Sequence, residues 1–140
     1  MGISTKKPPA PSESSEQKAL FEWAAWNKGR YLGLHLMYHI ANGGARHPAT
    51  GARLKAEGVK RGTPDVHLPV PRGQYAGLWI ELKAKKGGRL APEQLEWIEA
   101  LREHGHAVAV CYGCDDAVRV IKEYYALGAN LLTKVEEGDA

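Results

Sequence analysis

Cysteine, phenylalanine and long apolar runs are all scarce in this chain. Only two cysteines and one phenylalanine occur among 140 residues, so a disulfide framework is excluded and a reducing compartment such as the cytoplasm is expected. The apolar runs are only a few residues long, which excludes a transmembrane helix, and the N-terminus lacks the apolar segment of a signal peptide. The formal net charge of +3 is compatible with a nucleic-acid partner but too small to indicate one.

The two cysteines, Cys111 and Cys114, have the spacing of one half of a zinc site. No second pair completes such a site, and His104 and His106 would be poorly placed as further ligands. The same spacing occurs in thioredoxin-like redox motifs, at a helix start that follows a strand, but no other feature of the chain supports that function. We therefore interpret the pair as buried or unreactive thiols.

The chain is long enough, and at 44% apolar residues apolar enough, for one domain with its own core. We expect a disordered leader over residues 1–14, a folded domain over 15–128 and a polar tail over 129–140. The periodicity predicts helices over 15–28, 50–57, 92–104 and 115–128, the last capped by Asp115 or Asp116, and strands over 34–40, 65–70, 77–84 and 106–112. A hairpin combined with helical crossovers predicts an α/β domain with a mixed sheet flanked by helices.

Two carboxylates and a lysine are predicted to converge on neighbouring strands. Asp65 follows Pro64 at the start of one strand, and Glu81 and Lys83 share one face of the next. The short segment between the strands favours a hairpin, which would make them neighbours. Carboxylate oxygens suit Mg²⁺, and an ammonium can position a water or stabilise developing negative charge. The alternative is a solvated strand face with a cross-strand ion pair.

Two further polar side chains fall on faces that should be buried. Glu16 lies within the apolar stripe of the first helix, whereas Glu22 falls on the opposite side. A buried carboxylate needs a partner or a metal, although Glu16 could simply complement the helix dipole. Gln94 faces the core from the third predicted helix, where the acids would give its amide a partner. The alternative is a partly exposed glutamine in a first helical turn.

Basic and polar side chains lie on both sides of the acids in the sequence, as a site for a polyanion requires. Most such charge runs are merely solvated, and a loop after the first predicted strand could equally be a plain turn rather than a phosphate contact. The candidate DNA-contacting residues are His39, Asn42, Arg46, Lys55, Lys60, Arg61, Lys85, Lys86 and Arg89.

Taken together, these segments resemble the stand-alone VRR-NUC domains, a branch of the PD-(D/E)XK nuclease superfamily found in phages and bacteria. The resemblance spans about residues 14–125, with matching stretches at 15–17, 39–44, 51–65, 77–105 and 110–113. One departure is Ala41, where members commonly have proline. The resemblance implies a restriction-endonuclease-like fold and a cytoplasmic endonuclease, dependent on Mg²⁺ or Mn²⁺, encoded by a bacterium or a phage.

The resemblance also implies roles for particular residues. Asp65, Glu81 and the backbone carbonyl of Leu82 would bind metal, Lys83 would be the catalytic lysine, and Gln94 and Glu16 would correspond to the family's glutamine and first-helix acid. The expected partner is branched DNA such as a Holliday junction, cut by a homodimer, with no membrane and no small-molecule cofactor. Trp26, Tyr31 and Tyr124 are candidate dimer contacts.

Two other functions stay open. The enzyme could be a flap or single-strand nuclease of replication or repair. It could also be a non-catalytic DNA-binding relic of the fold, although the intact Asp65, Glu81 and Lys83 argue against that interpretation.

Overall fold

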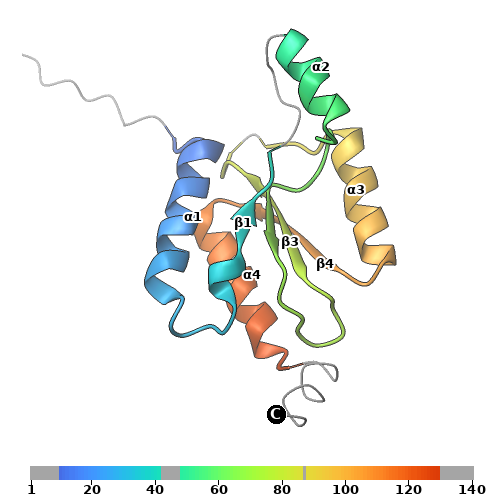
Figure 1. Ribbon diagram of the computed structural model, residues 1–140. Coiled ribbons are helices and arrows are strands. Elements are labelled where there is room, and N and C mark those ends of the chain that lie inside the picture. The colour runs from blue at the N-terminus through green and yellow to red at the C-terminus, as the bar shows by residue number, and fades with distance from the viewer. Residues whose placement is uncertain (1–9, 42–47, 87, 130–140) are drawn as a thin grey trace, which may run out of the picture.

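The computed structural model describes residues 10–41, 48–86 and 88–129, which form helices around a four-stranded sheet (Figure 1). The elements are α1 (Glu13–Asn27), a 3₁₀ helix (Leu34–Leu36), β1 (Tyr38–His39), α2 (Pro48–Ala56), β2 (Val66–Leu68), β3 (Leu78–Lys83), α3 (Pro92–Glu103), β4 (Ala107–Tyr112) and α4 (Cys114–Ala126). The sheet order is β1-β2-β3-β4; the first two pairings are antiparallel and the β3–β4 pairing is parallel. The predicted α/β class with a mixed sheet is confirmed.

The helices divide between the two faces of the sheet. α1 and α4 pack on each other and against β3, whereas α3 packs against β4 and lies on the other side (Figure 1). Leu78, Ile80 and Leu82 of β3 belong to the apolar core, together with Leu20 of α1 and Ile121 of α4. Because side chains alternate along a strand, the other face of β3 carries Trp79, Glu81 and Lys83. The polar side chains of β3 are therefore on the side of α3.

The predicted strand over residues 34–40 is wrong in its first half. Gly33 has a φ of 84°, and the N–H groups of Leu34 and Leu36 bond to the carbonyls of Tyr31 and Gly33. Leu34 and Met37 are both buried, and their spacing matches one turn of a 3₁₀ helix rather than the alternation of a strand. Only Tyr38–His39 pair with β2.

Two helix starts also differ from prediction. α1 begins at Glu13 because the Ser12 hydroxyl accepts a hydrogen bond from the Ser15 N–H at 3.1 Å, as an N-cap residue does. The prediction that Asp115 or Asp116 caps α4 is wrong: Gly113 is the N-cap residue of that helix. Gly128, with a φ of 82°, follows α4 as predicted.

The domain boundaries proposed from the sequence stay predictions, because residues 1–9 and 130–140 lie outside the described part of the chain. Among the residues that are described, no helix is both long and apolar enough to cross a membrane.

Candidate active site

Asp65 and Glu81 face each other across the β2–β3 hairpin. Val66 pairs with Ile80, so Asp65, one residue before β2 begins, stands opposite Glu81 in the same antiparallel register. The Asp65 carboxylate accepts a hydrogen bond of 2.7 Å from the Leu82 N–H of β3. On its other side, the Asp65 carbonyl accepts from the Ile40 N–H and contacts His39 Nδ1, each at 2.8 Å. Asp65 is thus held from both sides, and it joins the start of β2 to the end of β3.

Glu81 is a buried carboxylate with one satisfied oxygen. Only 2% of the residue is exposed. Its Oε1 accepts a hydrogen bond of 2.8 Å from Gln94 Nε2 and lies 3.8 Å from Lys83 Nζ. Its Oε2 is also buried and has no hydrogen-bond donor among the described residues. A buried carboxylate oxygen without a donor is costly, so this atom is the point of the site that best accommodates a cation.

Gln94 connects Glu81 and Lys83 through its side-chain amide. The Nε2 group donates to Glu81, and Oε1 accepts a hydrogen bond of 3.2 Å from Lys83 Nζ. The same oxygen accepts from the Ala91 N–H at 2.8 Å, just before the start of α3. Gln94 faces the sheet as predicted, and its position in the first turn of the helix fixes the amide with its donor toward the acid and its acceptor toward the lysine.

Burial and a neighbouring acid raise the pKa of Glu81 to about 8. Burial contributes most, and the Asp65 carboxylate comes next, while the Lys83 ammonium acts in the opposite direction. Glu13 at the start of α1 adds a smaller upward contribution to the same pKa. The sequence interpretation did not include Glu13, although an acid one turn before Glu16 is visible in the sequence. At neutral pH and without metal, Glu81 therefore keeps its proton, which a bound cation would displace.

The oxygen atoms at this site fit a hard divalent cation. Asp65 and Glu81 supply carboxylates, and the Leu82 carbonyl points to the same strand edge as its N–H, which meets Asp65. Within residues 10–41, 48–86 and 88–129, no three Asp, Glu, His or Cys side chains form a ready metal cluster. Mg²⁺ characteristically uses one or two carboxylates and completes its shell with water and substrate phosphate. The donor set therefore suits Mg²⁺ or Mn²⁺ and does not suit a structural zinc.

Glu16 lies on the buried face of α1, as predicted, and Glu22 is exposed. The Glu16 carboxylate accepts a hydrogen bond from the N–H of Cys114, the first residue of α4. This position complements the dipole of α4. Gly113, directly before Cys114, donates its N–H to the Lys83 carbonyl at 2.9 Å. Glu16 thus supports the backbone at the end of β3, and its described hydrogen bond goes to α4 rather than to Glu81.

The predicted DNA-contacting side chains are exposed where the structure describes them. They are His39, Lys55, Lys60, Arg61, Lys85, Lys86 and Arg89. Two of them approach acids: Arg61 Nε lies 3.9 Å from Glu93 Oε1, and Lys85 Nζ lies 3.7 Å from Asp115 Oδ2. Exposed pairs of this length contribute little to stability, so both cations can exchange partners. Asn42 and Arg46 lie outside the described residues.

The two cysteines are shielded thiols, one in the core and one at the start of α4. Cys111 is fully buried in the core, and burial raises the pKa of its thiol to about 12. Burial also raises the pKa of Cys114. Thiols with raised pKa values are poor nucleophiles and poor metal ligands at neutral pH, which agrees with the unreactive pair expected from the sequence.

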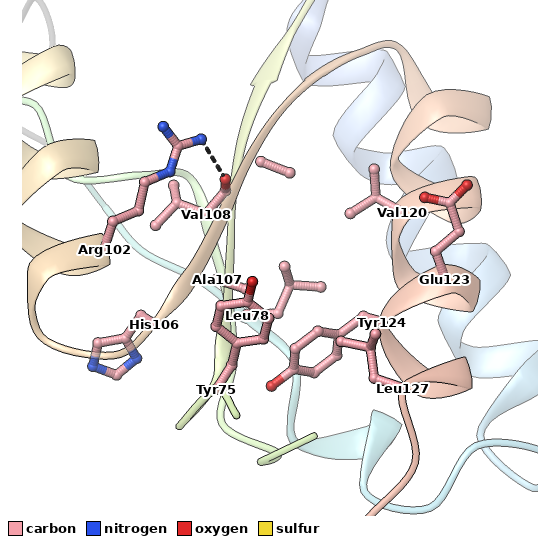
Figure 2. Close-up of a pocket in the computed structure, with 11 residues that line it drawn as sticks. Tyr75, Leu78, Arg102, His106, Ala107, Val108, Val120, Glu123, Tyr124 and Leu127 are labelled. Carbon is pink, nitrogen blue, oxygen red and sulfur yellow. Dashed lines mark hydrogen bonds between the residues drawn. The ribbon is translucent and has the colours of Figure 1, made fainter. Parts of the chain in front are cut away.

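Two cavities lie toward opposite edges of the sheet, one beside β4 and one beside β1. One, of about 580 Å³, is lined by Tyr75, Leu78, Tyr124 and other residues of α3, α4 and β4 (Figure 2). Most of its lining comes from β4, α4 and the end of α3, on the side of the sheet away from Asp65. A second cavity, of about 500 Å³, includes Thr63 and Trp79 in its lining, and it is therefore the one beside the acids.

Two facing acids and a buried lysine on a mixed sheet are an arrangement that metal-assisted phosphodiester hydrolysis can use. The VRR-NUC domain family matches residues 12–115, so the chain belongs to that family. A solved structure described as "VRR_NUC domain protein" is 29% identical and has a TM-score of 0.72, with coverage of 87% of this chain and 94% of that one. None of the curated proteins is similar enough in sequence to count as a match. The predicted restriction-endonuclease-like fold and the family resemblance are confirmed.

Proposed function

We propose that this chain is a metal-dependent endonuclease that hydrolyses phosphodiester bonds in DNA. The observation that carries the proposal is the pairing of Asp65 with Glu81, whose Oε2 is buried without a donor. In a folded protein such an atom is normally satisfied, and a divalent cation would satisfy it. Membership of a nuclease-type family supports the same function.

Asp65, Glu81 and the Leu82 carbonyl would hold Mg²⁺ or Mn²⁺. A bound divalent ion polarises the phosphate and favours deprotonation of water. Lys83 is the positioning group for the attacking water, because its ammonium is buried and directed by Gln94 and Glu81. The ammonium also stabilises the negative charge that develops on the phosphate. Gln94 is a positioning residue, and Glu16 supports the end of β3 from the opposite face of the sheet.

The exposed basic side chains around the site would bind phosphates of the DNA backbone. Contacts of this kind position a substrate without reading its sequence. We propose that the substrate is branched DNA and that two chains act together as a homodimer in the cytoplasm.

Trp26 and Leu32, which are 83% and 75% exposed, are suitable contacts between copies. Tyr124 was a wrong candidate, because only 4% of it is exposed and its hydroxyl donates to the Val70 carbonyl. Tyr31 packs between Trp23 and Tyr125 and is half-buried.

A cleavage panel tests the proposed function. Four-way junction, flap, single-stranded and linear duplex DNA are incubated with the full chain and Mg²⁺ or Mn²⁺. We expect the junction to be cut fastest, and faster cutting of the flap or single strand would favour that alternative. Lys83→Ala should abolish cleavage and leave junction binding intact. No cleavage of any substrate with either metal would overturn the enzyme in favour of a DNA-binding relic.

A further inference from the structure

We propose that the cavity beside the acids binds one unpaired nucleobase of the DNA substrate. Its lining includes Tyr38, Ile40, Val59, Lys60, Trp79 and Trp97, and we call it the aromatic cavity. The inference rests on the proposed nuclease function and adds a substrate class to it: DNA in which a nucleotide near the cut is free to leave the stack.

Two elements, β3 and α3, fix the position of the aromatic cavity relative to the acids. Trp79 precedes Glu81 by two residues on the same face of β3, which corresponds to about 6.6 Å along the strand. Trp97 lies one helical turn after Gln94 on α3, and residues at that spacing share a helix face. Stacked nucleotides advance about 3.4 Å each, so the cavity lies within a nucleotide or two of a phosphate bound by a metal at Asp65 and Glu81.

The aromatic rings of the cavity are held in place before any ligand arrives. Trp79 stacks on His67 with ring centroids 3.8 Å apart and an interplanar angle of 13°. His67 Nδ1 is in turn hydrogen-bonded to the Tyr38 hydroxyl at 2.8 Å. Trp97 Nε1 donates to the Arg61 carbonyl at 3.2 Å. Rings fixed in this way lose little entropy when a base stacks on them.

The charge and size of the aromatic cavity also fit a nucleotide. Lys60 lies in the lining and Arg61 follows it, so the phosphate of a nucleotide whose base is bound would meet positive charge. Glu57 is the acidic residue of the lining, and it is exposed at the end of the α2 segment, where Lys55 lies close by in sequence. The volume of about 500 Å³ is in the range of sites for small organic molecules.

A paired base cannot reach this cavity unless it leaves the duplex. Removing a base from the stack costs free energy, and the cost is lowest where the base is already mismatched or unpaired. Stacking of the base on an aromatic ring offsets this cost for any of the four bases. The nuclease should therefore prefer branch points, flaps and bulges, and its preference should depend on the rings of the cavity rather than on the metal site.

The experiment uses duplex DNA with one unpaired 2-aminopurine, placed at successive positions around the cut. In metal-free binding, fluorescence should be quenched at one position within two nucleotides of the scissile phosphate. With Mg²⁺, the unpaired substrate should be cut faster than the paired duplex. Trp97→Ala and Tyr38→Ala should each reduce that preference about tenfold and leave the rate on paired duplex within about twofold. Trp97→Phe should retain most of it.

The matched control is Tyr75→Ala, because Tyr75 is 41% exposed and Tyr38 is 46% exposed, but Tyr75 lines the other cavity (Figure 2). This variant should keep the full preference. If the alanine variants slow paired and unpaired substrates equally, or if quenching is absent at every position while DNA is bound, the base site is wrong and the nuclease function stands. If the wild-type chain neither binds nor cuts DNA, the proposed function fails, and the base site fails with it.

Discussion

Gln94, in the first turn of α3, donates a hydrogen bond of 2.8 Å to Glu81 on β3. Its carbonyl oxygen also accepts from Lys83 at 3.2 Å, so one amide sets the position of both the acid and the ammonium. Residues that orient metal ligands commonly contribute ten- to a hundredfold to activity.

Gln94→Ala should therefore reduce the single-turnover cleavage rate by roughly ten- to a hundredfold, with DNA affinity unchanged. Lys83 and Glu81 would remain, but each would lose its fixed partner. The control is Glu96→Ala, an exposed position on the same helix, which should cut at the wild-type rate. Wild-type cleavage by Gln94→Ala would show that the amide is dispensable.

The raised pKa of Glu81 predicts how stability depends on pH without metal. The folded chain holds this proton up to about pH 8, whereas the unfolded chain releases it near the ordinary glutamate pKa of 4.5. The contribution of this proton to the free energy of unfolding is therefore fully present below about pH 4.5 and is lost as the pH rises toward 8. Urea unfolding in EDTA should show wild type losing on the order of 2 kcal/mol relative to Glu81→Gln between pH 5 and 8. Parallel curves for the two proteins would contradict this account.

A divalent ion should reverse that loss. Above pH 7, Mg²⁺ or Mn²⁺ should raise the thermal midpoint of the wild-type chain, because binding to the folded state alone stabilises it by mass action. Asp65→Asn and Glu81→Gln should each reduce this shift of the thermal midpoint. The measurement does not depend on cleavage. An equal shift in all three proteins would indicate that the ions bind elsewhere.

Glu16→Ala should destabilise the fold by on the order of 1–3 kcal/mol, because the partly buried Cys114 N–H would lose its acceptor. Glu22→Ala, at an exposed position on the same helix, should change stability by less than about 0.5 kcal/mol. The metal-induced thermal shift should survive in Glu16→Ala. If the shift disappears while the unfolding midpoint in EDTA is unchanged, Glu16 is a metal ligand and its role at α4 is secondary.

Light scattering tests the homodimer. The wild-type chain at micromolar concentration should have about twice its monomer mass of 15.3 kDa. Trp26→Glu should shift it toward the monomer, because a charge would replace a large exposed apolar side chain. A wild-type mass near that of one chain would refute the dimer. If Trp26→Glu stays dimeric, Trp26 is not part of the contact between copies.

Local patterns predicted the strands that carry the acids. Alternation over β3 and the short link to Asp65 were sufficient, because a hairpin makes sequence neighbours into spatial neighbours. Helical periodicity likewise placed Gln94 and Glu16 on inward faces. Tertiary contacts were not accessible in this way. The pairing of Glu16 with Cys114 joins α1 to α4, and the aromatic cavity joins Tyr38, Trp79 and Trp97, so neither follows from spacing along one element.

Gly113, directly after β4, stands where there is no room for a side chain. Its φ is 92°, and an added Cβ would lie 2.7 Å from the Lys85 side chain and 3.1 Å from Glu16 Oε2. A methyl group there would push on the Lys85 side chain and shift the peptide whose N–H donates to the Lys83 carbonyl. Gly113→Ala would thus displace the end of β3 that carries Glu81 and Lys83, although every side chain of the candidate site would stay unchanged.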